Sequence, residues 1–164
     1  MKSFSACFIL GSYKSDLMVL CVTDTRFPLN VKMPGGMAIC KETPEETMRR
    51  EVFEETGGTR IVDSYLVHVV IFKNLTQYFY LATRVIPGFG PDRISKFEEN
   101  IFCNDVTISY IIARWLPIRE FADKLYHGQH GAFGAILVEL AKDQRFLSVY
   151  SELLQRFPNP NIKS

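Results

Sequence analysis

The stretch from Thr43 to Gly58 carries clear signals for the two ends of one helix. Thr43 can serve as the N-cap, Pro44 suits the first helical position, and Glu46 completes a capping box with Thr43. Gly57 and Gly58 supply the stop. The residues on both sides are rich in β-branched and aromatic side chains, which favour strands. Strands on both sides of one central helix indicate a mixed α/β sandwich.

The pattern of apolar residues predicts the other elements. Strands are expected at residues 5–10, 17–23, 61–72, 77–86 and 106–116. Turns are expected at 11–16 and 73–76, a loop at 24–32, and a further break in the pattern at 33–36. Residues 87–104 form the longest predicted loop, and their glycines, prolines and charges suggest a functional role. Helices are expected at 118–126 and from 131 to about 156.

Length and charge limit the class of protein. The 164 residues suit one domain, which we expect to span residues 1–157, with 158–164 as a flexible tail. The net charge of +1 argues against a broad cationic surface for duplex nucleic acid. We expect no membrane partner, because no apolar run reaches membrane-spanning length.

The cysteines are scattered along the chain. Cys7, Cys21, Cys40 and Cys103 are widely spaced and contain no CxxC pair, so the spacing gives no support for a zinc cluster. Isolated cysteines in apolar surroundings predict reduced, buried thiols in a cytoplasmic protein, with disulfides as the less favoured alternative.

Three glutamates fall on one side of the predicted central helix. With 100° per residue and Glu51 set at 0°, Glu55 lies at about 40° and Glu54 at about −60°. Met48 and Val52 lie at about 60° and 100°, so the acids border the side that should be buried. Crowding three negative charges costs free energy unless another group compensates them.

Two kinds of group can compensate these charges. Arg50 is one, because it lies four residues from both Glu46 and Glu54. A divalent cation is the other, since Mg²⁺ and similar ions take carboxylate oxygens, phosphate oxygens and waters. The arrangement therefore suits a cation held against a phosphorylated substrate. An acidic face that is simply solvated remains the alternative.

The spacing of these residues resembles the Nudix box, the signature of the Nudix hydrolases, written G-x5-E-x7-R-E-U-x-E-E-x-G-U with U apolar. The matching positions are Gly36, Glu42, Arg50, Glu51, Val52, Glu54, Glu55 and Gly57. Gly58 replaces the last apolar residue, which affects one packing contact and no metal-ligand position. Residues 115–121 are also similar to the stretch that follows the late strand in this family.

The resemblance implies an α/β/α sandwich with a mixed central sheet and a loop–helix–loop catalytic motif. It also implies that Glu51, Glu54 and Glu55 bind Mg²⁺ or Mn²⁺. Arg50 would pair with these acids and fix their rotamers.

Three further residues of the box region receive roles from the same resemblance. Gly35 and Gly36 would let the backbone approach the phosphates of the substrate closely. Glu42 would be a helper, either structural or close to the metal.

The family cleaves nucleoside diphosphates linked to another moiety, so we expect a metal-dependent pyrophosphohydrolase. The cation would activate a water, and a carboxylate would take its proton. Glu54 or Glu55 are candidates for that carboxylate. Glu98 and Glu99 in the long loop are further candidates, with Asp105 third and a merely solvated loop as the alternative.

Several other side chains are weaker candidates. Tyr78, Tyr80 and Arg84 share one face of a predicted strand, where they could stack a base and approach phosphate, although packing is the simpler reading. His68 is expected in the core. His127 and His130 are expected at the start of the last helix rather than in catalysis.

The resemblance leaves three functions open. The first is hydrolysis of a nucleotide-type small molecule. The second is a regulatory module that binds nucleotides without activity. The third is an isopentenyl diphosphate isomerase, which would need a cysteine such as Cys40 or Cys103 and an altered box. The substrate is not determined, and a homodimer is possible.

Overall fold

The computed structural model describes residues 1–102 and 106–159, and the strands in this part of the chain form two four-stranded sheets. The first sheet has the order β4 (Gly35–Met37), β1 (Lys2–Phe8), β6 (Leu75–Ile86) and β5 (Arg60–Phe72). The second has the order β2 (Leu10–Tyr13), β3 (Asp16–Asp24), β8 (Val106–Pro117) and β7 (Ile94–Phe102). The first sheet is mixed, because β1 runs parallel to β6 and antiparallel to β4. The second is antiparallel.

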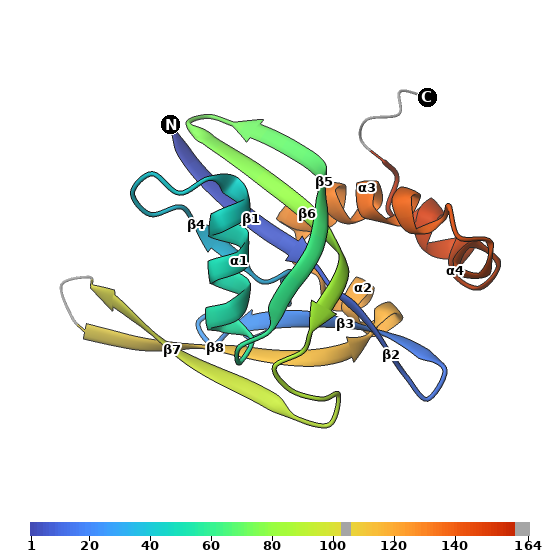
Figure 1. Ribbon diagram of the computed structural model, residues 1–164, viewed down its shortest axis with the longest axis horizontal. Helices are drawn as coiled ribbons and strands as arrows, with labels where there is room; N and C mark the ends of the chain where they lie inside the picture. Colours follow the sequence, from blue (N-terminus) through green and yellow to red (C-terminus); the bar gives the residue numbers. More distant parts are fainter. Residues whose placement is uncertain (103–105, 160–164) are drawn as a thin grey trace.

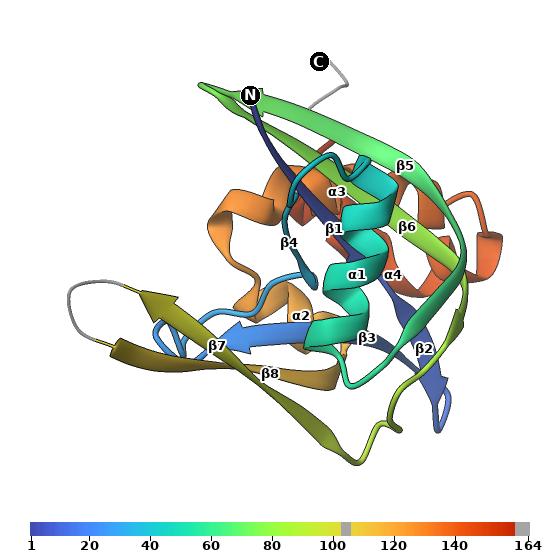
Figure 2. The same ribbon diagram turned by 60° about the vertical axis from the view of Figure 1, so that its left-hand side comes forward.

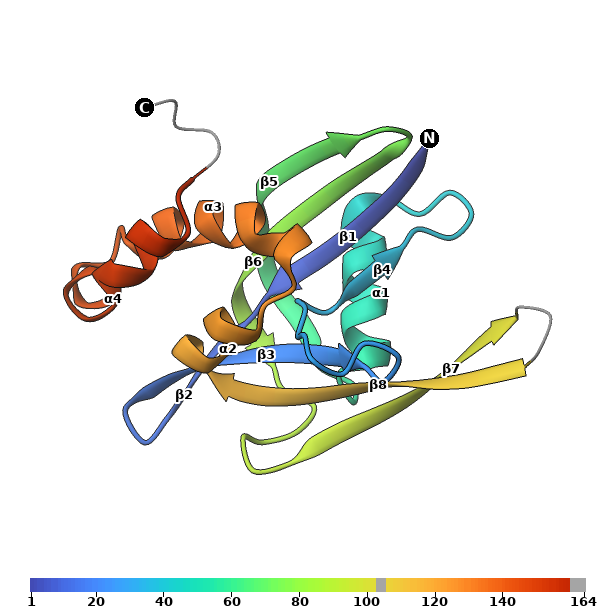
Figure 3. The ribbon, with the colours of Figure 1, turned by 180° about the vertical axis from the view of Figure 1, so that it is seen from behind.

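Helices cover both faces of the first sheet. The helical elements are α1 (Pro44–Glu55), α2 (Ile118–Lys124), the 3₁₀ turn η1 (His127–Gln129), α3 (His130–Leu140) and α4 (Gln144–Arg156). Helix α1 lies on one side of this sheet, and α2, α3 and α4 lie on the other (Figures 1 and 3). The predicted mixed α/β sandwich is therefore confirmed. No helix in the described ranges is both long and apolar enough to cross a membrane.

The alternation of side chains in β6 separates two apolar cores. Phe79 and Leu81 pack in the cluster that includes α2, α3 and α4. Tyr80 points the other way and packs with Met48 and Val52 of α1. The predicted period of two in this strand is thus confirmed, and it places α1 over a buried apolar surface.

Both predicted hairpin turns are shorter in the structure. Residues 11–13 belong to β2, and the turn consists of Lys14 and Ser15, whose φ angles are 48° and 69°. The second turn consists of residues 73 and 74. Two-residue turns with positive φ match the twist of the flanking strands, which is why strand pairing extends so far into the predicted turns.

The prediction of a loop at 87–104 is wrong for residues 94–102, while residues 103 and 104 lie outside the described residues. Residues 94–102 form β7, which pairs antiparallel with β8. Charged side chains such as Lys96, whose Nζ lies 3.9 Å from the centre of the Tyr110 ring, conceal the strand pattern in the sequence. Residues 33–36 also differ from the prediction, because Gly35 and Gly36 belong to β4 and pair with β1.

The long helix predicted from residue 131 divides into α3 and α4. The chain turns at residues 141–143, and the Asp143 side chain caps α4 by accepting a hydrogen bond from the Arg145 N–H at 2.9 Å. At the end of α4, Phe157 is buried against the core. Residues 160–164 of the predicted tail lie outside the described residues.

The cysteines lie in different environments. Cys7 and Cys21 are buried thiols, as predicted. Cys40 is exposed in the loop before α1, contrary to the prediction of a buried thiol. Cys103 lies outside the described residues.

We predict that Gly134→Ala destabilises the protein. A Cβ at Gly134 in α3 would lie 2.6 Å from the main-chain oxygen of Pro158 and 2.8 Å from that of Phe157. Alanine favours an isolated helix over glycine by about 1 kcal/mol, but overpacking a core costs about 1–3 kcal/mol. Urea unfolding should show a net loss of up to about 2 kcal/mol. Gly90→Ala is the control, since a Cβ there meets no atom within 4 Å. A more stable Gly134→Ala variant would contradict this packing.

Candidate active site

Helix α1 begins and ends where the sequence predicts. Thr43 Oγ1 accepts a hydrogen bond from the Glu46 N–H at 3.2 Å, and Glu46 Oε1 accepts one from the Thr43 N–H at 3.3 Å. At the other end, Gly57 and Gly58 have φ angles of 64° and 90°. Both the capping box and the glycine stop are therefore confirmed, and they set the register of the acidic residues on the helix.

One guanidinium group joins three carboxylates. Arg50 donates through Nε and Nη2 to the two oxygens of Glu42, at 2.7 and 3.0 Å. Its Nη1 donates to Glu51 at 2.9 Å and to Glu54 at 3.2 Å. Its Nη2 also donates to the main-chain oxygen of Met37 at 3.0 Å. The predicted pair with Glu46 does not form, because that side chain closes the capping box instead.

Glu42 lies in the loop before α1 and is held from several directions. Besides the two bonds from Arg50, it accepts hydrogen bonds from the Ile39 N–H at 2.9 Å and from Thr47 Oγ1 at 3.2 Å. The hydrogen bonds from Arg50 are the main reason that the pKa of Glu42 falls from 4.5 to about 2. Glu42 therefore stays ionised and fixes Arg50 from the side opposite the helix acids.

Glu55 is the most buried acid of the group. It is 7% exposed, and its Oε1 accepts a hydrogen bond from the Gly35 N–H at 2.9 Å. Burial raises the pKa of Glu55 well above its ordinary value, and the nearby charges of Glu51 and Glu99 raise it further. A buried acid with a raised pKa at the edge of β4 is typical of functional sites.

Glu51 lies against the glycine pair of β4. A Cβ at Gly36 would overlap the Glu51 carboxyl group, so only glycine leaves this acid in place. Burial raises the pKa of Glu51, although the bond from Arg50 lowers it in part. Figure 2 shows how α1 lies between the first sheet and the hairpin of β7 and β8.

The structure separates the two glutamates predicted in the long loop. They lie on β7, and neighbouring residues of a strand point to opposite faces. Ser95, on the same face as Glu99, lies close to Gly57 at the end of α1. The charge of Glu99 acts on both Glu51 and Glu55, whereas Glu98 belongs to the opposite face. Asp105 lies outside the described residues.

The carboxylate oxygens of this group are of the kind that a hard cation takes, but they do not surround one point. Among residues 1–102 and 106–159, no three His, Cys, Asp or Glu side chains converge closely enough to hold a metal ion as they stand. Glu51 and Glu54 accept hydrogen bonds from Arg50, and Glu55 accepts one from the Gly35 N–H. The carboxylates outnumber the one arginine, so the site fits a divalent cation provided that Glu51 and Glu54 turn towards it.

The remaining predicted residues lie away from this group or in the core. Tyr80 is 8% exposed and packs beneath α1, and Tyr78 packs partly against the same cluster, which fits the packing interpretation. Arg84 is exposed and forms an ion pair with Asp63 at 3.4 Å.

The histidines lie where the sequence predicts them. His68 is buried, with its ring centre 6.2 Å from that of Phe79. His127 begins η1, and His130 begins α3 with its Nε2 2.9 Å from the Leu125 oxygen. These positions fit core and helix-start roles.

Main-chain groups were the part of the site that residue types did not reveal. The Gly35 N–H and the Met37 oxygen each bind a charged side chain from α1. Main-chain groups are common to nearly all residues, so the sequence does not mark which of them bind side chains. The two adjacent glycines were the one indication of such a place.

The family model and the similar solved structures name the same family. A family model described as NUDIX domain matches residues 3–133. No curated protein matches the sequence significantly. The structure is similar to a MutT NUDIX hydrolase from Burkholderia pseudomallei, with a TM-score of 0.53 and 15% identity over 82% of this chain and 97% of that one.

Two further solved structures share the fold. The NUDIX domain of NrtR from Shewanella oneidensis, complexed with ADP ribose, gives a TM-score of 0.55 and 16% identity over 87% of each chain. A MutT structure described for Aliivibrio salmonicida and Vibrio cholerae gives 0.53 and 18% identity over 95% of this chain and 98% of that one.

We predict that Glu42→Gln changes how stability depends on pH. The folded-state pKa of Glu42 is lowered to about 2, so its contribution is present above pH 4.5 and is lost as the pH falls towards 2. Thermal unfolding should show the variant less stable than the parent at pH 7, with the gap closing below pH 4.5. Glu45→Gln, which removes an exposed ion pair with Arg49, is the control. A gap that stays constant down to pH 2 would contradict the Arg50 contact.

Proposed function

The chain belongs to the Nudix family, and from this premise we propose that it is a metal-dependent hydrolase of nucleotide-type substrates. It would cleave the pyrophosphate linkage of a nucleoside di- or triphosphate derivative. The observation that carries the proposal is the surplus of acid around Arg50, which binds Glu42, Glu51 and Glu54 while Glu55 lies buried beside them. One guanidinium offsets only one of up to four negative charges, and a divalent cation would offset two more.

We assign the cation, Mg²⁺ or Mn²⁺, to Glu51, Glu54 and Glu55. When bound, it would draw charge from the phosphoryl oxygens and lower the pKa of an attacking water. Arg50, fixed by Glu42, would orient Glu51 and Glu54. Gly35 and Gly36 would let the phosphates approach the main chain of β4 beside these acids.

We assign the acceptance of the water proton to Glu99. It comes from the second sheet, is exposed, and acts electrostatically on both Glu51 and Glu55. An acid that is not held by Arg50 keeps its oxygens free to move to a substrate, which favours this role over Glu54. Tyr78, Tyr80 and Arg84 would act at most through packing and position.

The main alternative is nucleotide binding without hydrolysis. The NrtR domain that shares this fold was crystallised with ADP ribose. Four crowded carboxylates favour hydrolysis, because a purely binding module gains nothing from their repulsion. They also favour hydrolysis over isomerisation, which would need an altered box. The substrate would be a small molecule met in the cytoplasm, where the buried thiols of Cys7 and Cys21 would stay reduced.

We predict that Glu55→Gln abolishes turnover without unfolding the protein. Glutamine still accepts the Gly35 N–H bond, but it removes a buried charge that the fold disfavours, so the melting temperature at pH 7 should be equal or higher. Loss of a ligand should cost roughly a hundredfold or more in rate. The assay is phosphate or pyrophosphate release from nucleoside triphosphates, nucleotide sugars and ADP-ribose with Mg²⁺ or Mn²⁺. Full activity in the variant would refute the assignment, and ADP-ribose binding without any hydrolysis by the parent would favour the binding module.

We predict that Glu99→Gln lowers kcat by roughly a hundredfold or more, as expected for a lost general base, while Mn²⁺ affinity measured by calorimetry changes little. Glu98→Gln is the matched control, because it removes the same charge from the other face of β7 and should leave kcat unchanged. Equal effects of the two substitutions would mean that neither residue takes the proton.

A further inference from the structure

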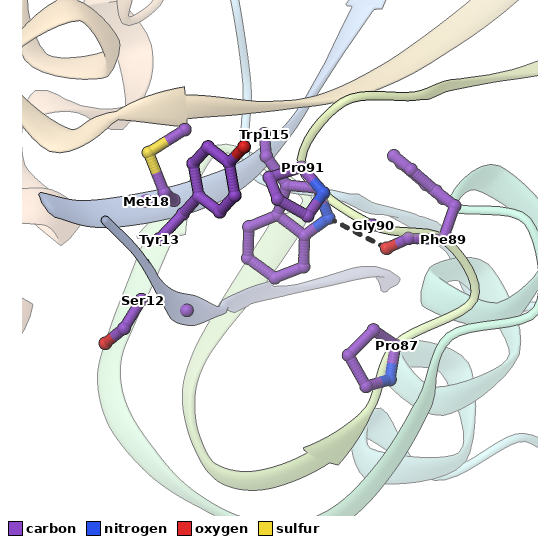
Figure 4. A pocket seen from close by; sticks show the side chains of 9 residues that line it. Ser12, Tyr13, Met18, Pro87, Phe89, Gly90, Pro91 and Trp115 are labelled. Atoms are coloured by element: carbon purple, nitrogen blue, oxygen red, sulfur yellow. Dashed lines mark hydrogen bonds between the residues drawn. The ribbon is translucent and has the colours of Figure 1, made fainter. Parts of the chain in front are cut away.

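A cavity of about 440 Å³ opens between strands β2, β3 and β8 of the second sheet and the segment that links β6 to β7 (Figure 4). Tyr13 of β2 and Trp115 of β8 line it, together with Phe89, Gly90 and Pro91 from the linking segment. None of the acids assigned above lines this cavity. Its volume falls within the range of small-molecule pockets.

Trp115 lines the cavity, although it is only 8% exposed and also packs in the core cluster that contains Tyr80. Its Nε1 donates a hydrogen bond to the Phe89 oxygen at 3.2 Å, so its donor is already used (Figure 4). Gly11 lets the ring lie against β2, since a Cβ there would come within 3.0 Å of the indole. What Trp115 offers to a ligand is therefore the small part of its ring that stays exposed, rather than a polar group.

The walls of the cavity favour an uncharged ligand. Aromatic, proline and glycine residues dominate them, and no residue that lines the cavity is charged. Lys14, which does not line the cavity, has its Nζ 5.2 Å from the centre of the Tyr13 ring. An ion placed in this cavity would lose its hydration without gaining a partner, whereas a flat ring would gain stacking and apolar contact.

The segment that forms one wall is held in place before any ligand arrives. The Gly88 N–H donates to Thr59 Oγ1 at 3.0 Å, and Gly88 packs directly on the main chain of Gly57. Together with the bond from Trp115 to Phe89, these contacts tie the segment at two points. A preformed wall lowers the entropy lost on binding.

We propose that this cavity binds an uncharged, flat ring of the size of a nucleobase or nucleoside, at a site separate from the acids of α1. The ring lies against the indole of Trp115, with Tyr13 and Pro91 beside it.

The test uses the fluorescence of Trp115, which is the only tryptophan in the chain. Adenosine and guanosine serve as probes, without metal, because they carry no phosphate that would direct them to the acids of α1. Each should change the emission of Trp115 in a saturable manner. The result does not depend on whether the protein hydrolyses nucleotides, so it is distinct from the tests of that proposal.

Two variants at one position complete the experiment. Gly90→Leu should fill part of the cavity and weaken binding at least about tenfold, because the added side chain takes space that the ligand needs. Gly90→Ala adds one carbon in open space and should bind as the parent does. Thermal melting checks that both variants fold. Unchanged Trp115 emission up to millimolar adenosine and guanosine would overturn the proposal, and so would equal affinity in a folded Gly90→Leu variant.

Discussion

The contacts of Arg50 hold the acidic region together. Its planar group reaches a loop through Glu42, the helix through Glu51 and Glu54, and β4 through the Met37 oxygen. A lysine could not replace it, because an ammonium group lacks the fixed fork that binds both oxygens of Glu42 while facing two further acids. Without this group, the carboxylates of α1 would repel one another at the surface of the core.

The burial of the Glu55 carboxyl group costs the fold free energy. The acid is buried because α1 must press Met48 and Val52 onto the first sheet, and Glu55 lies beside that apolar stripe. Within the described part of the chain, the one hydrogen bond that compensates its charge comes from the Gly35 N–H at the edge of β4. The burial of Glu55 therefore lowers the stability of the fold at a residue for which we propose a role in catalysis. Functional sites commonly carry such a cost.

Sequence reasoning succeeded where local signals were complete. The ends of α1, the shared side of its acids and the alternation in β6 follow from capping, helix geometry and strand period. It failed where pairing with a distant strand decides the structure, as in β4 and β7, whose glycines and charges resemble a loop. For the same reason it could not separate Glu99 from Glu98, since only the pairing of β7 with β8 selects the face that meets α1.

The acids of α1 and the cavity beside Trp115 share no residue. The segment that links β6 to β7 lies near both, because it lines the cavity and its Gly88 packs on Gly57 at the end of α1. Substitutions around Trp115 therefore leave the charge balance at Arg50 intact. During evolution, a substitution at Tyr13 or Pro91 can change which ligand the cavity prefers while the acids of α1 stay unchanged. Diversity among related chains should accordingly accumulate faster around the cavity than around the arginine.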